Sequence, residues 1–148
     1  MNNVLVPIDD ASDLRWVVNQ AIERYRKEAV GVHLLNVQRP LPRHVTRFFN
    51  NGNLRNYYHD TGMRVLEPAI GMLDQAGIPH SDHVLVGPKA ETIVRFAAEC
   101  QCGQIILDNR AREPFAFFGL GSIGSQVRHL MDVGAGGASP TEASHRVN

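Results

Sequence analysis

A glycine-rich turn that leads into a helical pattern is the feature of this sequence best suited to hold an anion. The turn, Gly119–Gly124, follows the apolar run Ile105–Leu107, and the helical pattern continues to Met131. Glycines let a ligand approach the backbone closely, and the first turn of a helix has unpaired N–H groups and a partial positive charge. The chemistry expected there is the binding of a phosphate or a similar group.

The same glycines match the G-x-G-x-x-G pattern of dinucleotide-binding domains, but their context does not fit that fold. The pattern normally follows the first strand of a βαβ unit and precedes an acidic residue by about 20 positions. Here it follows the last apolar run, and the first acid well past it, Glu142, lies in a glycine-rich tail. We therefore reject the dinucleotide fold. A flexible glycine turn entering a helix remains the simpler alternative to an anion site.

Two further side chains, those of Asp9 and Ser122, could each have more than one chemical role. Asp9 follows the apolar run Val4–Ile8 and could hold Mg²⁺ or a ribose hydroxyl, or be satisfied by the amides that follow it. Ser122 has no histidine and acid placed as obvious partners, so helix capping or a phosphate contact explains it better than a nucleophilic role.

The cysteines and the paired histidines are weak candidates for metal binding. Cys100 and Cys102 cannot build a disulfide framework, and two ligands do not make a zinc site. We expect reduced thiols at a helix end before Gly103. His80 and His83 flank a Ser-Asp pair, and this spacing fits a surface turn before a strand better than a metal site.

The segment 38–58 combines basic and aromatic side chains and contains no acid. Such interleaving could grip a single strand of nucleic acid. Because the whole chain has no net charge, we favour a covering loop or a dimer contact. The side chains concerned are Arg39, Arg43, His44, Arg47, Phe48, Phe49, Arg55, Tyr57 and Tyr58, with His59 next.

The elements that must position these residues alternate between apolar runs and helical patterns. Strands are predicted at 4–8, 29–37, 83–86 and 105–107. Helices are predicted after an N-cap at Ser12, from near Leu54 to Gly77 with a distortion or division at Pro68, from Glu91 to near Gly103, and after Gly121. This alternation predicts a doubly wound α/β domain with a parallel sheet and helices on both faces.

Length and composition exclude several classes of protein. The chain has 148 residues, enough for one domain with its own core. Lys plus Arg and Asp plus Glu both number 15, so no overall field favours nucleic acid or an anionic membrane. No apolar run reaches the length of a membrane span, and no signal peptide is recognisable. We expect a soluble cytoplasmic protein.

Four pieces of the sequence occur in an order and spacing that point to a known family. They are VLVPIDDAS, VHLLNV, HVLVGPKAETIVRFAAE, and IILDNRA followed after nine residues by GSIGSQV. Together they resemble the universal stress protein family over about residues 2–131. The resemblance implies a domain at 1–131 with the adenine nucleotide alpha hydrolase-like fold. The segment 132–148 is small, polar and glycine-rich, and we expect it to be a disordered tail.

The ATP-binding branch of that family implies a site for ATP or another adenine nucleotide, with Mg²⁺ held through the nucleotide by Asp9. By this resemblance Pro7, Asp9 and Val37 surround the adenosine, and Leu107 lies at the strand end. The residues near the phosphates would be Arg110, Gly121, Ser122 and Ile123.

The chain departs from that branch at two positions, where Asp108 and Ala111 replace glycines. Asp108 adds a charged side chain where backbone should approach the ligand. At about 4 Å and an effective dielectric near 20, it would repel a phosphate charge by roughly 4 kcal/mol. Ala111 loses the low-cost positive φ of glycine, while Arg110 and Arg112 could offset part of the repulsion.

A third departure concerns the fifth strand that the family usually has after its fourth helix. The corresponding segment, Asp132–Gly136, is glycine-rich and makes a poor strand, so we expect this strand to be missing. In many relatives that strand pairs across a dimer. We still expect a homodimer, formed through the helices or the segment 38–58.

The resemblance implies a non-enzymatic stress-response module that binds an adenine nucleotide as a regulatory ligand. The first alternative is a nucleotide-independent, dimeric interaction protein of the same family, with an unknown protein partner. A slow ATPase, with Asp9 holding the metal, ranks lower because no residue stands out as a base for water.

Overall fold

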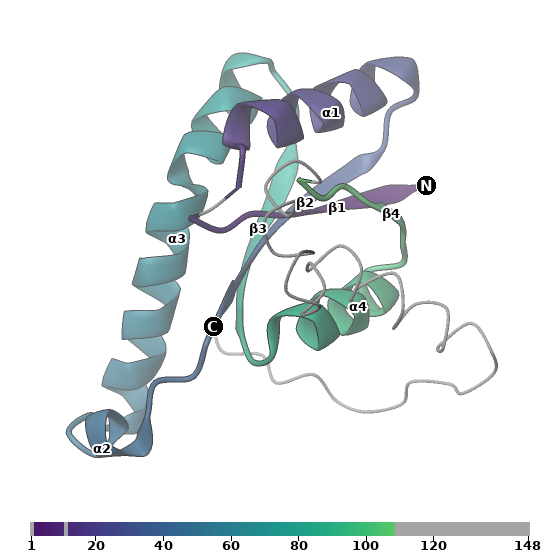
Figure 1. The fold of residues 1–148 in the computed structure, drawn as a ribbon. Helices are drawn as coiled ribbons and strands as arrows, with labels where there is room; N and C mark the ends of the chain where they lie inside the picture. Colours follow the sequence, from purple (N-terminus) through teal and green to yellow (C-terminus); the bar gives the residue numbers. More distant parts are fainter. Residues whose placement is uncertain (1, 11, 109–148) are drawn as a thin grey trace, which may run out of the picture.

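The computed structural model describes residues 2–10 and 12–108, and within them strands and helices alternate (Figure 1). The elements are β1 (Asn3–Pro7), α1 (Leu14–Lys27), β2 (Gly31–Gln38), α2 (Arg43–Thr46), α3 (Asn51–Gln75), β3 (His80–Val86), α4 (Lys89–Glu99) and β4 (Cys102–Ile105). None of these helices combines the length and the apolar character that a membrane span requires.

The four described strands form one parallel sheet in the order β3-β2-β1-β4. Val4 pairs with Val32, and Leu5 pairs with Ile105 on the other side of β1. The chain therefore proceeds from β1 outward to β3 and returns to add β4 at the opposite side. This order confirms the predicted doubly wound fold. The predicted fourth helix, the fifth-strand segment and the tail lie outside the described residues.

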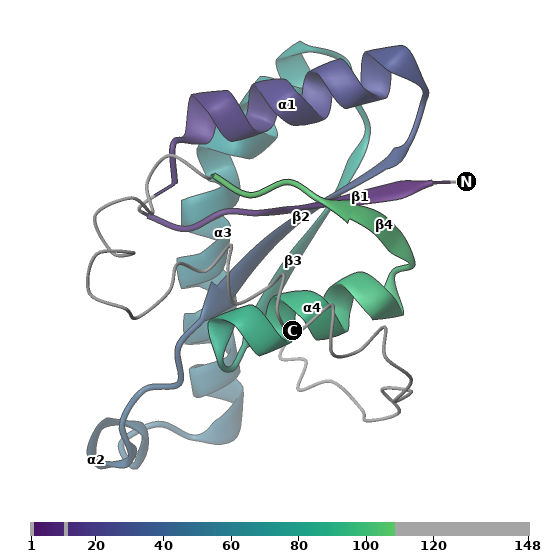
Figure 2. The same ribbon diagram turned by 45° about the vertical axis from the view of Figure 1, so that its right-hand side comes forward.

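The predicted helices on both faces are confirmed, with two separate cores (Figure 2). Helices α1 and α3 cover one face, where Val32 and Leu34 of β2 are buried. Helix α4 covers the other face, where Leu35 and Val37 are buried. Because β1 and β2 are central and covered twice, their sequences are continuous apolar runs, as expected for parallel strands.

Helix ends agree with the prediction in one case and differ in another. Gly77 has a φ of 72° and ends α3. The Gly77 N–H donates to Asp74 O and the Ile78 N–H donates to Leu73 O, which is the Schellman arrangement. The N-cap of α1 is Asp13 rather than Ser12, because the Asp13 carboxylate accepts from the Trp16 N–H at 3.3 Å. Ser12 instead bonds to Asp9.

Helix α3 is not divided at Pro68, although the sequence favours a distortion or a break there. Proline removes one intrahelical donor, which leaves the carbonyl of Arg64 without its usual partner. Both residues are exposed, so water can satisfy that carbonyl. A proline on the solvent side of a long helix therefore costs less than the sequence suggests.

Segment 38–58 is more regular than expected. It contains the short helix α2, and Asn50 caps α3 by accepting from the Asn53 N–H at 2.7 Å. The residues Asn50–Asn53 therefore form the start of α3. Tyr58 is buried and its hydroxyl accepts from the Leu41 N–H at 2.8 Å, which ties the segment to α3.

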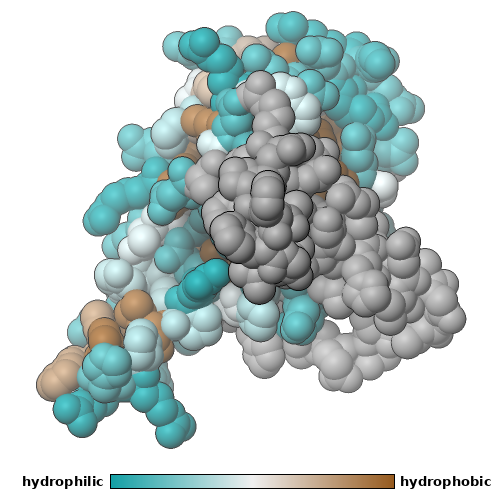
Figure 3. Space-filling model, in the orientation of Figure 1, coloured by the Kyte–Doolittle hydropathy of each residue, from teal (hydrophilic) through white to brown (hydrophobic). Residues whose placement is uncertain are grey.

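The α2 corner projects beyond the sheet and carries a hydrophobic surface (Figure 3). Phe48 is 78% exposed there, beneath the guanidinium of Arg47 at 5.1 Å from the ring centre. Tyr57 is 42% exposed and packs against Phe49. The prediction that the aromatic side chains of this segment pack is confirmed for Tyr58, whereas Phe48 and Tyr57 are exposed.

Candidate functional site

The order of the strands defines where a ligand would bind. Strand β1 has β2 on one side and β4 on the other, and the connecting helices α1, which follows β1, and α4, which precedes β4, lie on opposite faces of the sheet. In open parallel sheets, ligands bind beyond the carboxyl ends of the strands at such a reversal. Asp9 follows β1 and Asp108 follows β4, so both predicted positions lie at this edge.

Asp9 is held by two side chains that come from different parts of the chain. Its Oδ2 lies 2.7 Å from Nζ of Lys89, which is 80 residues away, and its Oδ1 accepts from the Ser12 hydroxyl at 3.0 Å. The side chains of Asp9 and Lys89 are 34% and 24% exposed. The pair is thus partly accessible to solvent, and Lys89 places a cation next to the predicted ligand position.

The loop between β3 and α4 brings Lys89 to Asp9. Gly87 directly follows β3, and its N–H donates to Gln38 O at 3.0 Å, which keeps the loop against the end of β2. A Cβ at Gly87 would lie 2.7 Å from Oγ1 of buried Thr92. The absence of a side chain lets the loop pass close to the first turn of α4, where Lys89 begins the helix.

Asp108 contacts the start of α1. Its carboxylate accepts a hydrogen bond from the backbone N–H of Asp13, the N-cap residue. A carboxylate is stabilising at a helix N-terminus, where donors are unpaired and the dipole is positive. Asp108 therefore has a structural partner, in addition to standing where the resemblance places a glycine.

The apolar members of the predicted site lie at the ends of three neighbouring strands. Pro7 ends β1 opposite Leu35, Val37 is buried near the end of β2, and Leu107 packs against the core beneath α4. The other predicted members, Arg110, Gly121, Ser122 and Ile123, lie outside the described residues.

Two polar features of this edge were missed from the sequence. Asn36 is buried and donates to Ile8 O at 2.9 Å, which braces the turn before Asp9. Its oxygen accepts from the Gln38 side chain. Lys89 was also missed, although its position directly after Gly87-Pro88 at a strand end was a usable signal.

His80 and His83 are not in a surface turn, which corrects that prediction, because both belong to β3. They are an odd number of residues apart, so their side chains lie on opposite faces and cannot share a metal. His80 contacts Asp82 at 2.7 Å and Asp74 at 2.8 Å. Burial lowers the pKa of His80, but the hydrogen bonds and charges of Asp74 and Asp82 outweigh it and leave the pKa raised.

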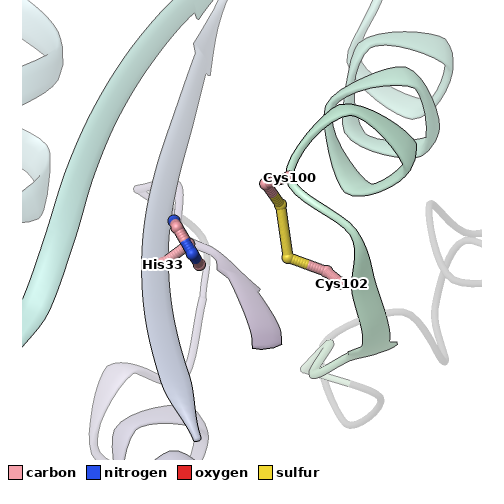
Figure 4. Close-up of side chains that lie close together, drawn as sticks. All are labelled: His33, Cys100 and Cys102. Carbon is pink, nitrogen blue, oxygen red and sulfur yellow. A yellow bond between two sulfur atoms is a disulfide. The ribbon is translucent and has the colours of Figure 1, made fainter. Parts of the chain in front are cut away.

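The prediction of two reduced thiols at a helix end is also corrected. Cys100 and Cys102 form a disulfide, and Cys102 begins β4 instead of ending a helix (Figure 4). Strand β4 accordingly starts earlier than predicted, at Cys102, although the ladder continues with the Ile106 N–H donating to Leu5 O. His33 of β2 faces the two sulfurs.

These features define an open-sheet α/β protein of the doubly wound class, with polar side chains at the carboxyl edge where the strand order reverses. The chain belongs to the universal stress protein family, because the sequence model of that family matches residues 1–133. No curated protein matches the sequence significantly.

Solved structures of low sequence identity share the fold. A universal stress protein in complex with cAMP is 19% identical, with 86% of this chain and 90% of that chain covered and a TM-score of 0.67. One from Archaeoglobus fulgidus in complex with dAMP is 20% identical, covers 87% and 90%, and has a TM-score of 0.59. A family member from Burkholderia pseudomallei is 18% identical, covers 80% and 90%, and scores 0.56.

Proposed function

We propose that this chain is a stress-response module that binds an adenine nucleotide as a regulatory ligand, in the crevice beyond β1 and β4. The observation that carries the proposal is the reversal of strand order between β1 and β4, with the partly exposed pair of Asp9 and Lys89 at its edge. Two structures of the same fold contain cAMP and dAMP, which supports an adenine nucleotide as the ligand class.

In this proposal the adenosine lies against Pro7 and Val37 and beside Leu107. Asp9 bonds to a ribose hydroxyl or to nucleotide-bound Mg²⁺, and Lys89 is available to neutralise charge nearby. The phosphates lie near Arg110 and the turn at 121–123, where Ser122 and the backbone of Gly121 and Ile123 act as donors.

Isothermal titration calorimetry with Mg²⁺–ATP, AMP and cAMP tests the proposal directly. We expect saturable one-to-one binding with a dissociation constant in the micromolar range, about −8 kcal/mol at 1 μM. An Asp9→Ala variant should bind at least tenfold more weakly. Absence of heat, together with an unchanged melting temperature at millimolar concentrations of each nucleotide, would sink the proposal.

Asp108 should decide which nucleotide is preferred, because its charge faces the ligand's phosphates. Asp108→Asn keeps an oxygen that can accept from the Asp13 N–H but removes the charge. Repulsion of roughly 4 kcal/mol at about 4 Å is an upper limit that solvent and salt reduce. We expect ATP to bind about tenfold more tightly to the variant, and cAMP, with one phosphate charge, only about twofold more tightly.

The matched control is Asp60→Asn, which removes the same charge from an exposed position of α3. It should leave all dissociation constants unchanged. Equal gains for ATP and cAMP in Asp108→Asn would show that the Asp108 charge does not face the phosphates.

The second candidate is a nucleotide-independent interaction protein, and the observation that favours it is the exposed aromatic corner at α2. In either case we propose a cytoplasmic homodimer. The two candidates are separated by the calorimetry above, since the second predicts no binding.

A further inference from the structure

Three side chains of types that bind metals lie close together where the strands begin, at the end of the sheet opposite its carboxyl edge (Figure 4). His33 comes from β2, Cys100 follows α4, and Cys102 begins β4. One ligand atom from each lies within 4.8 Å of the others, and all three residues are partly buried. Residues from three separate elements are thus gathered at one point by the fold.

The backbone around the cysteines holds their side chains on the same side. Gln101 between them has a φ of 57°, which turns the chain between the end of α4 and the start of β4. The two Cα atoms are 5.5 Å apart. The Asn3 side chain donates to Cys100 O at 2.7 Å and anchors this turn to β1.

Gly31 makes room for that anchor. A Cβ on Gly31 would lie 2.3 Å from Oδ1 of Asn3, so any larger residue would displace the asparagine. The same Cβ would be 3.7 Å from Nε2 of His33, which places this ring nitrogen beside Gly31.

The imidazole of His33 is oriented by a second histidine. Nδ1 of His33 lies 3.1 Å from Nε2 of His83, and the two rings stack at 5.3 Å. His83 in turn packs against Phe96 of α4 at 4.6 Å. Since Nδ1 is engaged, Nε2 is the nitrogen that remains to bind a ligand. Such outer hydrogen bonds are usual for histidines that bind metals.

We propose that the reduced Cys100–Cys102 pair and His33 bind one thiophilic cation, represented by Zn²⁺, through two thiolates and the Nε2 of His33. Zinc takes Cys sulfur at about 2.3 Å and His nitrogen at about 2.0 Å, so tetrahedral ligand atoms are separated by roughly 3.3–3.8 Å. The observed ligand atoms lie within 4.8 Å of one another, and the two sulfurs must move apart once their bond is reduced. Water completes the fourth position.

The disulfide and the metal-bound dithiolate are alternative states of Cys100 and Cys102. A dithiol or phosphine reductant supplies two electrons, and with two protons the S–S bond is converted into two thiols while the reductant is oxidised. Binding of Zn²⁺ then forms two Zn–S bonds and one Zn–N bond and releases the two thiol protons. The site thus exists only in the reduced protein.

The direct test is titration of the phosphine-reduced, metal-free full chain with Co²⁺ and then with Zn²⁺. We expect one Co²⁺ per chain, with thiolate-to-cobalt charge-transfer absorption and the visible bands of a tetrahedral complex, both lost when Zn²⁺ displaces cobalt. The oxidised protein should show none of this. A reduced protein without charge-transfer bands would overturn the proposal, as would binding that is equal in both redox states.

Variants test each ligand separately. Cys102→Ser and His33→Gln should each weaken Zn²⁺ binding more than about 100-fold, whereas His83→Gln, which only orients His33, should cost roughly 10- to 100-fold. His44→Gln, an exposed histidine of α2, is the control and should bind as the wild type does. Unchanged affinity in folded Cys102→Ser would refute the site, and the wild-type cobalt spectrum decides the question if a buried variant fails to fold.

Discussion

His80 joins the end of α3 to the start of β3 by an ion-paired triad with Asp74 and Asp82. Its side chain is 9% exposed, so its charged form depends on these two carboxylates. The raised pKa means that the folded protein holds this proton more tightly than the unfolded chain does. The stabilisation is therefore complete below the unfolded pKa of about 6.5 and is lost as pH rises through the folded pKa.

Replacing His80 by Gln should accordingly destabilise the protein in a pH-dependent way. We expect a loss of roughly 1–2 kcal/mol at about pH 5.5, because hydrogen bonds to charged groups are involved, and a smaller loss at about pH 8.5. Urea unfolding at both pH values measures the difference. His44→Gln, at an exposed site, should show no such trend, and a loss that grows with pH would contradict the assignment.

Some contacts of single residues could not be predicted from the sequence. Asp9 could be selected because it follows an apolar run, but its contact with Lys89 joins positions 80 residues apart and depends on the fold. The bond between Cys100 and Cys102 depends on the turn at Gln101, whose φ of 57° is uncommon for a residue with a side chain. Neither contact leaves a local pattern.

Two glycines in α3 allow a matched test at the scale of the element. A Cβ on Gly62 would lie 2.5 Å from Cγ1 of Val84, so the helix approaches β3 closely there. A Cβ on Gly71 would meet nothing within 4 Å. Gly62→Ala should destabilise the protein by about 1–3 kcal/mol through overpacking. Gly71→Ala should stabilise it by up to about 1 kcal/mol, because alanine favours helix.

Urea unfolding of both variants at one pH gives the comparison. The two substitutions are chemically identical and lie in the same helix. Helix propensity alone would therefore change the free energy of unfolding of both variants in the same direction. Stabilisation of Gly62→Ala would mean that α3 does not rest on β3 as closely as the distances indicate.

Elements were predictable from sequence where one physical pattern dominated. Buried central strands are continuous apolar runs, which is why β1 and β2 were located to within two residues. Boundaries set by side-chain caps were less accurate. Ser12 and Asp13 are both good N-caps by type, and the choice of Asp13 is fixed by its bond to the Trp16 N–H and by Asp108. The four-residue helix α2 is too short to leave a periodic signal.

The doubly wound class followed from the order of the described elements, because parallel strands joined by helices have few allowed topologies, whereas the strand order β3-β2-β1-β4 was not predicted. The position of β4 beside β1 creates the reversal of strand order on which the proposed function rests. The proposed phosphate contacts of Arg110 and Gly121 lie outside the described part, and the sequence indicates them only through the family resemblance.

Among the residues that the structure describes, the most exposed aromatic side chain is that of Phe48 at the α2 corner, and this is where we expect two copies to meet. Phe48 is 78% exposed, and aromatic side chains flanked by arginine are enriched in protein interfaces. Light scattering coupled to size exclusion, at high micromolar concentration, should give about twice the 16.4 kDa chain mass. Phe48→Ser should reduce the measured mass to that of the monomer. At protein concentrations too low for dimers to form, its melting temperature should equal that of the wild type.

The control for that experiment is Lys27→Ser, which alters an exposed position at the end of α1, away from α2. It should remain dimeric, since it lies outside the proposed contact. A monomeric wild type would rule out the homodimer. A dimeric Phe48→Ser would move the interface from the α2 corner to another surface, because loss of an aromatic anchor at the centre of a small interface typically costs more than about 2 kcal/mol of association energy.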